Sequence, residues 1–426
     1  MRMKMFVFAA LLCGVCAGAY AELQNVEVGG GIRIRGNWYD FDNSLPEVAF
    51  VEQRTRLNFK ADFTDNVSTF IEVDNYGNWG TDFRSDYLTG LDGAGGGDVA
   101  LYQAYIDVNE MWGTPLHLRV GRQEVALGSQ WLLGVNDASS LFQGLSHDAV
   151  LLSYATDQFS VAAWIGKIAE GLDDMWAQSD TDHYGIYASY LGIEDVTLDA
   201  YWIYVRDREG RTAGLDVDLH TVGLRGAGKV GAFDFEAEVA YQFGKGEIEG
   251  VPGDLDAGNL AGNLEVGYTF DASIQPRIYL GGAYFGGDAD GDLSFLRLFS
   301  NWEYSEFIEN TELSNAWLLR AGVSILPTET VKLALAVTYF QVDDSIDTPG
   351  FLGFGGDDGD SDLGWEVGLY GSYQYSEDLA FRAGYAHYFG DDALDGELIA
   401  LNGNAVFAGD DSDDYDYLFV ETEIKF

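Results

Sequence analysis

The chain has 426 residues, a formal net charge of −47 at pH 7, 54 glycines, 6 prolines and 2 cysteines. So large an excess of carboxylates excludes a nucleic-acid-binding protein, which needs basic patches against phosphate. Hydrophobic residues make up 47% of the chain and aromatic residues 14%, a content that argues against disorder driven by charge.

The first residues have the pattern of a secretory leader. An apolar run over residues 5–16 follows two basic residues, and Ala19-Tyr20-Ala21 is the small-x-small pattern that a signal peptidase cleaves. We therefore expect residues 1–21 to be a signal peptide and residues 22–426 to form one domain. Both cysteines lie in this leader and neither follows a small residue, so we expect no lipid anchor, disulfide or thiolate metal site in the mature chain.

Beyond the leader, no apolar run approaches the roughly 20 residues that a membrane-spanning helix needs. Apolar residues instead recur at every second position, which is the period of a β-strand. This alternation predicts about eighteen strands. They cover residues 26–38, 51–63, 67–76, 98–108, 116–127, 147–155, 158–167, 181–191, 195–206, 217–229, 232–244, 257–271, 275–286, 313–326, 330–343, 362–376, 378–390 and 415–426.

The joints between these strands are alternately short and long, and the long ones are rich in Gly, Asp and Asn. This rhythm favours an outer-membrane β-barrel over a soluble array of β-sandwiches. The prediction is an all-β transmembrane antiparallel barrel of about 18 strands, with short periplasmic turns and long acidic extracellular loops, in a Gram-negative-type bacterium. The segment 128–146, whose lone acid is Asp137, is the best candidate for a loop that folds into the lumen.

The last strand is expected to close the barrel. Its apolar face includes Leu418 and Phe426, while Glu421 and Glu423 fall on the polar face. Because Phe426 carries the terminal carboxylate and still belongs to the apolar face, we expect this strand to be needed for closure. We also expect the outer-membrane assembly machinery to recognise it.

Alternation also predicts which basic side chains face the lumen. In the strand 51–63, Leu57 and Phe59 lie on the lipid-compatible face, so Arg54 and Arg56 point inward. Two interpretations stay open for such residues, namely guidance of anions and salt bridges along the wall with acids such as Glu72. The basic residues expected in the lumen are Arg33, Arg35, Arg54, Arg56, Lys60, Arg119, Arg277, Arg320 and Arg382.

Dense carboxylates in the long loops suggest a site for a divalent cation, because Ca²⁺ prefers hard oxygen ligands. A solvated surface that binds no ion is the alternative. The candidate ligands are Asp288, Asp290, Asp292, Asp357, Asp358 and Asp360.

One stretch carries a family resemblance. Gly121-Arg122-Gln123-Glu124 leads into a loop that returns through Ser146-His147-Asp148-Ala149-Val150. This resembles the alginate export family, in which a GRQE-like motif precedes a loop and an (S)FDAV-like strand. The resemblance implies an eighteen-stranded barrel that exports an anionic polysaccharide through an arginine-lined pore.

The resemblance further implies that Arg122, Gln123 and Glu124 lie at the constriction, with Arg122 as a candidate anion contact. Strict alternation from Leu118 points Arg122 outward, and only a bulge at Gly121 would turn it into the pore. The chain departs from the family at Trp131, where arginine is usual, and at His147, where phenylalanine is usual.

No enzyme is expected. The five histidines fall on separate strands, and Ser146-His147-Asp148 is contiguous, so its side chains cannot form a catalytic triad on a strand. The expected function is a channel in the bilayer for passive diffusion or export of anionic or sugar-like solutes, alginate included. Inward aromatics such as Tyr279 and Phe340 are candidates for stacking on sugars.

Two alternatives remain at this point. One is a surface-interaction barrel with a plugged lumen and loops that bind divalent ions. The other is a barrel that sheathes a periplasmic partner such as an electron carrier.

Overall fold

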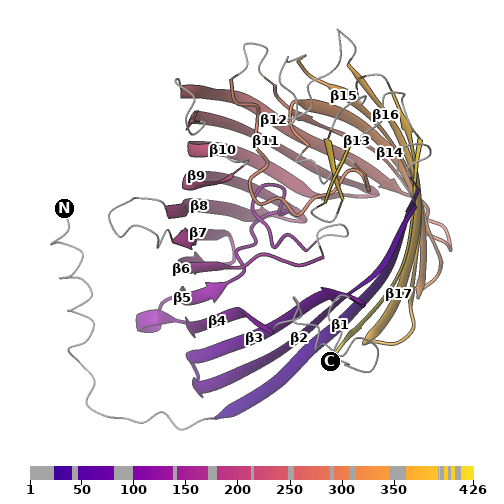
Figure 1. Cartoon of the computed structure of the whole chain (residues 1–426). Coiled ribbons are helices and arrows are strands. Elements are labelled where there is room, and N and C mark those ends of the chain that lie inside the picture. Colours follow the sequence, from indigo (N-terminus) through magenta and orange to yellow (C-terminus); the bar gives the residue numbers. More distant parts are fainter. Residues whose placement is uncertain are drawn as a thin grey trace, which may run out of the picture.

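The computed structural model describes residues 24–40, 47–80, 99–137, 142–170, 180–212, 215–247, 254–287, 292–307, 313–344, 361–391, 393, 398–401, 404–407 and 414–426. Eighteen strands form one closed antiparallel sheet, in which each strand pairs with its neighbours along the chain (Figure 1). Among these residues, no helix is long and apolar enough to cross a membrane. The barrel strands are β1 (Asn25–Asp40), β2 (Val48–Thr64), β3 (Val67–Asn78), β4 (Ala100–Val108), β5 (Leu116–Gln123), β6 (His147–Ala155), β7 (Phe159–Glu170), β8 (Asp180–Ile193), β9 (Val196–Thr212), β10 (Leu215–Val230), β11 (Phe233–Glu247), β12 (Asp254–Thr269), β13 (Arg277–Phe285), β14 (Ala316–Thr328), β15 (Val331–Val342), β16 (Asp362–Gln374), β17 (Leu379–Gly390) and β20 (Asp414–Lys425).

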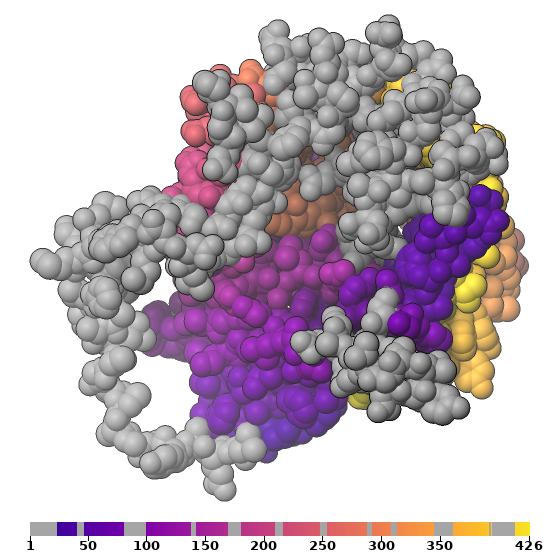
Figure 2. Space-filling model, in the orientation of Figure 1, coloured from indigo at the N-terminus to yellow at the C-terminus, as the bar shows by residue number. Residues whose placement is uncertain are grey.

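Strand β20 closes the barrel, as its sequence predicts. It pairs with β17 on one side and with β1 on the other, and Gly31 lies opposite Lys425. Phe426 continues this ladder, because its N–H donates to the carbonyl of Gly30 at 3.0 Å and its carbonyl accepts from the N–H of Gly30 at 2.9 Å. The space-filling view shows the indigo N-terminal strands beside the yellow C-terminal strands (Figure 2). Closure leaves no unpaired sheet edge in lipid, where such groups would cost several kcal/mol each.

The two faces of the sheet differ as the alternation predicts. Along β1, the inward residues Arg33, Arg35 and Tyr39 are buried. The opposite face carries exposed apolar side chains such as Phe59 and Leu280. The sheet therefore presents an apolar surface to the lipid and a polar and aromatic surface to the lumen.

The eighteen expected strands correspond one for one to the barrel strands, with three local differences. The strand expected over residues 116–127 ends at Gln123, because the chain turns into the lumen there. A short 3₁₀ helix, η1 (Met111–Gly113), occupies the joint between β4 and β5. An unpredicted hairpin, β18 (Leu398–Leu401) and β19 (Asn404–Phe407), lies in the connection between β17 and β20.

Within the described part of the chain, two connections fold into the lumen. The first inward loop, described over residues 124–137 and 142–146, joins β5 to β6, and Figure 1 draws it in purple within the space that the strands enclose. The second inward loop, described over residues 292–307, lies between β13 and β14. A parallel bridge joins Leu133 to Phe299. The expectation that segment 128–146 folds inward is met over its described residues, whereas the second inward loop was not expected.

An apolar core surrounds the place where the two loops meet. Trp131 is 1% exposed, and its ring lies 5.8 Å from that of Phe285 on β13 and 6.5 Å from that of Phe295. Phe295 is itself fully buried. Burial of these large side chains stabilises the inward position of both loops.

Candidate functional site

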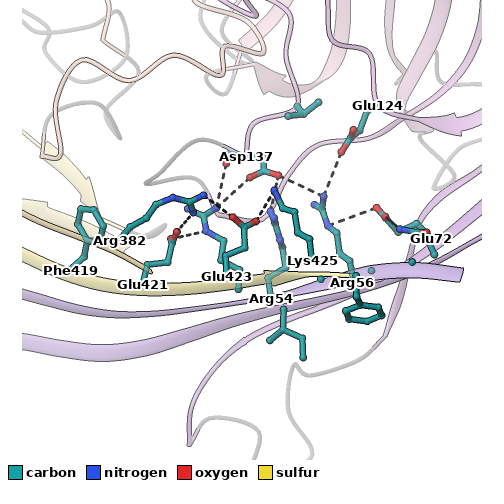
Figure 3. A pocket seen from close by; sticks show the side chains of 18 residues that line it. Arg54, Arg56, Glu72, Glu124, Asp137, Arg382, Phe419, Glu421, Glu423 and Lys425 are labelled. Carbon is teal, nitrogen blue, oxygen red and sulfur yellow. Dashed lines mark hydrogen bonds and ion pairs between the residues drawn. The ribbon is translucent and has the colours of Figure 1, made fainter. Parts of the chain in front are cut away.

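A polar cavity of about 740 Å³ lies beside the inward loops. Its walls come from β1, β2, β3, β17 and β20, together with the first inward loop (Figure 3). Five basic side chains and five carboxylates line it. These are Arg33, Arg54, Arg56, Arg382 and Lys425, and Glu72, Glu124, Asp137, Glu421 and Glu423.

Three of the arginines converge on one carboxylate. We call Arg33, Arg54 and Arg56 the arginine cluster. Arg33 on β1 lies directly opposite Arg54 on β2, and Arg56 follows two residues later on the same face. The Asp137 carboxylate lies 3.0 Å from Nη1 of Arg54, 3.4 Å from Nη1 of Arg33 and 3.7 Å from Nη1 of Arg56. Because like charges on opposing strand positions repel, a shared counter-ion stabilises this arrangement.

Carboxylates on the barrel strands form ion pairs with guanidinium groups of the cavity. Nε of Arg33 lies 2.7 Å from Glu421 on β20, and Nε of Arg56 lies 3.0 Å from Asp74 on β3. Arg382 on β17 shares Glu421 at 2.5 Å. These charge-assisted bonds fix the orientation of Arg33 and Arg56, while Nη1 of Arg54 donates to the carbonyl of Phe142 at 2.8 Å.

Aromatic rings pack against the same guanidinium groups. Arg56 lies over the ring of Tyr102 at 3.8 Å, and Arg33 lies over the ring of Phe142 at 4.4 Å. Such cation–π contacts restrict the planes of the guanidinium groups further. The cluster is therefore built before any solute arrives.

Asp137 is anchored through its backbone to the second inward loop. Its N–H donates to Oδ1 of Asn301 at 2.5 Å. Glu124, at the start of the first inward loop, accepts a hydrogen bond from the Tyr102 hydroxyl at 2.7 Å. Burial raises the pKa of Glu124, and the Tyr102 hydroxyl and the Arg56 charge offset part of that rise.

The structure places four of the expected basic residues in the polar cavity and the others elsewhere. Arg33, Arg54, Arg56 and Arg382 line it. Arg35 is buried behind it against Glu52, at 2.9 Å. The other basic residues expected in the lumen do not line this cavity and have partners elsewhere. These pairs are Lys60 with Glu27 and Asp62, Arg119 with Asp107, and Arg277 with Asp234 and Glu265, while Arg320 packs against Tyr279.

The position implied for Arg122 by the family resemblance is wrong. The register of β5 with β6 is continuous through Gly121, so no bulge turns the side chain inward. Arg122 is exposed on the outer face, where Nε and Nη2 each donate to Asp148 at 2.8 Å. Gln123 is fully buried and donates to the carbonyl of Ala149 at 2.9 Å. Of the three motif residues, only Glu124 lines the cavity.

The two aromatic candidates for stacking on sugars lie in different surroundings. Phe340 is fully buried in the apolar core, so no solute reaches it. Tyr279 lies between Arg277 and Arg320, whose guanidinium carbons are 5.1 Å and 5.6 Å from its ring centre.

Reasoning from the sequence missed the second inward loop, which supplies Asn301. A signal was present, since Leu293-Ser294-Phe295-Leu296 is an apolar run in a connection that should face water. It also missed that Glu421 would serve two arginines. Alternation did place Glu421 on the polar face, but its partners depend on how the barrel closes.

The calcium site stays a prediction. Of its six candidate ligands, only Asp292 belongs to the described residues, and its Oδ1 accepts a hydrogen bond from the N–H of Asp256 at 2.9 Å. Within the described ranges, no group of three or more His, Cys, Asp or Glu side chains could hold a metal ion.

A closed eighteen-stranded barrel with an apolar outer belt and a charged lumen is the architecture of an outer-membrane channel. The family model for alginate export matches residues 25–406, so the chain belongs to the alginate export family. It is a protein of the outer membrane and lies in its bilayer. A comparison with curated protein sequences finds no match.

Solved outer-membrane barrels share this fold at low sequence identity. OccAB4 of Acinetobacter baumannii is 14% identical, with a TM-score of 0.58 over 96% of this chain and 100% of that chain. OpdL of Pseudomonas aeruginosa is 13% identical, with a TM-score of 0.58 over 94% of this chain and 99% of that one. OpdK of Pseudomonas aeruginosa, solved with vanillate, is 12% identical, with a TM-score of 0.55 over 94% and 98%.

Proposed function

We propose that this barrel is a passive channel for anionic solutes, chiefly carboxylates, which cross the lumen through the polar cavity beside the inward loops. The convergence of Arg33, Arg54 and Arg56 on one carboxylate carries the proposal. A guanidinium fork matches the geometry of a carboxylate, and three such groups lower the free energy of a negative charge inside the narrow passage. Solute motion is electrodiffusive and follows the concentration gradient.

The chemistry of the solute is supported by two independent hints. The family name refers to alginate, a polymer of sugar carboxylates, and the OpdK structure contains vanillate, an aromatic carboxylate. The shared feature is the carboxylate group, which is what the arginine cluster is built to contact. Neutral sugars share the passage without this contact, so we expect them to cross more slowly than uronic acids of similar size.

The open cavity favours a channel over a plugged surface-interaction barrel. The two inward loops fill part of the lumen, yet a volume of about 740 Å³ remains between the first of them and the wall of β1 and β2. A plugged barrel would pass almost no current, so single-channel conductance separates the two readings. We further propose that assembly machinery recognises the β20 strand with Phe426 at its end.

The test is the reversal potential of the protein in a planar bilayer under a salt gradient. The double variant Arg54→Gln/Arg56→Gln should lose most of the wild-type preference for anions. The matched control is Arg122→Gln, which removes one arginine from the outer face and should leave selectivity unchanged. The proposal would be refuted if the wild-type channel prefers cations and keeps that preference after the loop acids are neutralised. Liposome swelling with a uronic acid and with the matching neutral sugar gives a second readout.

A further inference from the structure

We propose that Asp137 is an internal competitor for the carboxylate-binding position. Its side chain occupies the position in the arginine cluster that a solute carboxylate takes, and each arriving solute displaces it. This inference rests on the proposed function, because it assumes that carboxylates travel through the polar cavity. The new element is that Asp137 sets the affinity of the arginine cluster for solute carboxylates.

The contacts of Asp137 are those expected of a bound carboxylate. One oxygen lies 3.4 Å from Arg33, and the other lies 3.0 Å from Arg54 and 3.7 Å from Arg56. Figure 3 shows the carboxylate reaching Arg54 and Arg56 from the side of the inward loop, opposite the strands that carry them. A solute carboxylate that enters the cavity meets the same N–H groups from the same side.

Among the carboxylates that pair with the arginine cluster, Asp137 has the combination of features that displacement requires. Its side chain is 25% exposed, whereas that of Glu421 is 2% exposed and that of Asp74 is 10% exposed. Glu421 and Asp74 stand on strands whose backbone is fixed by the sheet, while Asp137 belongs to a loop. Glu124 is also accessible, but it approaches only Arg56, at 3.6 Å, and the Tyr102 hydroxyl holds it.

The local charge at the arginine cluster favours exchange with an anion. When Asp137 leaves, the three guanidinium groups lose the carboxylate that they share. A solute carboxylate replaces it, and a neutral sugar does not.

Competition of this kind tunes affinity without removing the site. The apparent dissociation constant of a solute equals its intrinsic constant divided by the fraction of time that the position is free of Asp137. Conduction benefits, since a solute must bind well enough to enter and weakly enough to leave. Because the Asp137 carboxylate stays next to the site, it takes back the position and speeds dissociation of the solute.

The first experiment is the variant Asp137→Asn, which keeps the backbone N–H that donates to Asn301. Glucuronate is titrated against single-channel current, and its apparent dissociation constant should fall about tenfold, the effect of losing one charged hydrogen-bonding partner. Glucose should show no change. The matched control is Asp148→Asn, which removes the same charge from a carboxylate–arginine pair on the outer face.

The outcomes separate this inference from the proposed function. If Asp137→Asn leaves glucuronate affinity within twofold of wild type while Arg54→Gln weakens it, the channel proposal stands and the competitor is refuted. If neither variant alters glucuronate binding, the arginine cluster is not the carboxylate site and both fail.

A second variant guards against misfolding of the first. Cys13 and Cys16 are the only cysteines of the chain and lie in the expected leader, so Asp137→Cys introduces a unique reactive thiol. A methanethiosulfonate reagent that carries a sulfonate attaches a negative group through a mixed disulfide and releases methanesulfinate. The sulfonate adduct should restore wild-type glucuronate affinity, and a neutral adduct of similar size should not. Equal effects of both adducts would overturn the role of the charge.

Discussion

The indole N–H of Trp131 donates to the hydroxyl of Tyr304 at 2.9 Å, and that hydroxyl donates in turn to Oδ1 of Asn263 on β12 at 2.9 Å. This chain of hydrogen bonds ties the first inward loop to the second, and the second to the barrel wall. Ser129 adds a contact on the same side, because its hydroxyl donates to Glu238 on β11 at 3.2 Å. With Asp137 bound to β1 and β2, the first inward loop is fastened on both sides of the lumen.

The variant Trp131→Ala should loosen both inward loops. Truncation of a fully buried aromatic side chain costs about 3–5 kcal/mol and leaves the Tyr304 hydroxyl without its donor. The barrel ladder is untouched, so the protein should still fold and insert, with a larger and noisier single-channel conductance. Trp112→Ala is the control, since that side chain is 84% exposed at the joint between β4 and β5. Unchanged conductance in Trp131→Ala would mean that the loops do not limit the passage.

The Arg35–Glu52 pair should contribute strongly to stability. The two side chains are 1% and 0% exposed, and Glu52 also accepts from Asn37 at 2.8 Å and from the Tyr76 hydroxyl at 3.1 Å. Glu52→Gln removes the carboxylate that lies 2.9 Å from the buried Arg35 guanidinium, and loss of one charge of a buried pair costs about 3–5 kcal/mol. The melting temperature in detergent should fall clearly. The exposed pair of Lys245 and Asp254 gives the comparison, because Asp254→Asn should leave the melting temperature unchanged.

The second inward loop should be held more tightly at low pH. Burial, together with the nearby Glu303 and Glu366, raises the pKa of Glu306 from 4.5 to about 8. A carboxyl group with a raised pKa favours the inward loop when protonated. Its stabilising contribution is therefore complete below about pH 4.5 and is lost as the pH rises through about 8.

Hydrogen–deuterium exchange of the peptide 292–307 measures this effect, after correction for the intrinsic rate at each pH. Protection should be greater at pH 6 than at pH 9. Glu306→Gln should abolish the difference, because it mimics the protonated group at both values. Glu377→Gln, in the exposed turn between β16 and β17, should keep the wild-type dependence. Equal protection of the wild type at both pH values would contradict the assignment.

Removal of Phe426 should slow closure of the barrel. Two backbone hydrogen bonds with Gly30 are lost, and the seam between β20 and β1 is left one residue short. We expect a lower yield of heat-modifiable folded barrel in a refolding assay, with normal strand content in the fraction that folds. Phe270→Ala removes another exposed phenylalanine, next to the end of β12, and should refold like wild type. Normal refolding of the truncated chain would show that the last pair is dispensable.

The two-residue alternation of apolar and polar side chains predicted much of the fold from sequence alone. Eighteen strands, their faces and the closing role of residues 415–426 follow from an alternation that each strand expresses locally. Alternation was also the better guide at Arg122, where it pointed outward against the family resemblance and the continuous register agrees with it.

Tertiary structure alone decided which charges share a cavity. Arg33 and Glu421 are 388 residues apart in the chain and meet at 2.7 Å because β1 pairs with β20. Asp137 reaches the arginine cluster because apolar side chains far apart in sequence, such as Trp131 and Phe295, bury each other inside the barrel. A repeat of two residues specifies the face on which a side chain lies, but the long connections have no such repeat. Their path depends on packing between distant segments, and that packing places the Asp137 carboxylate beside all three arginines of the cluster.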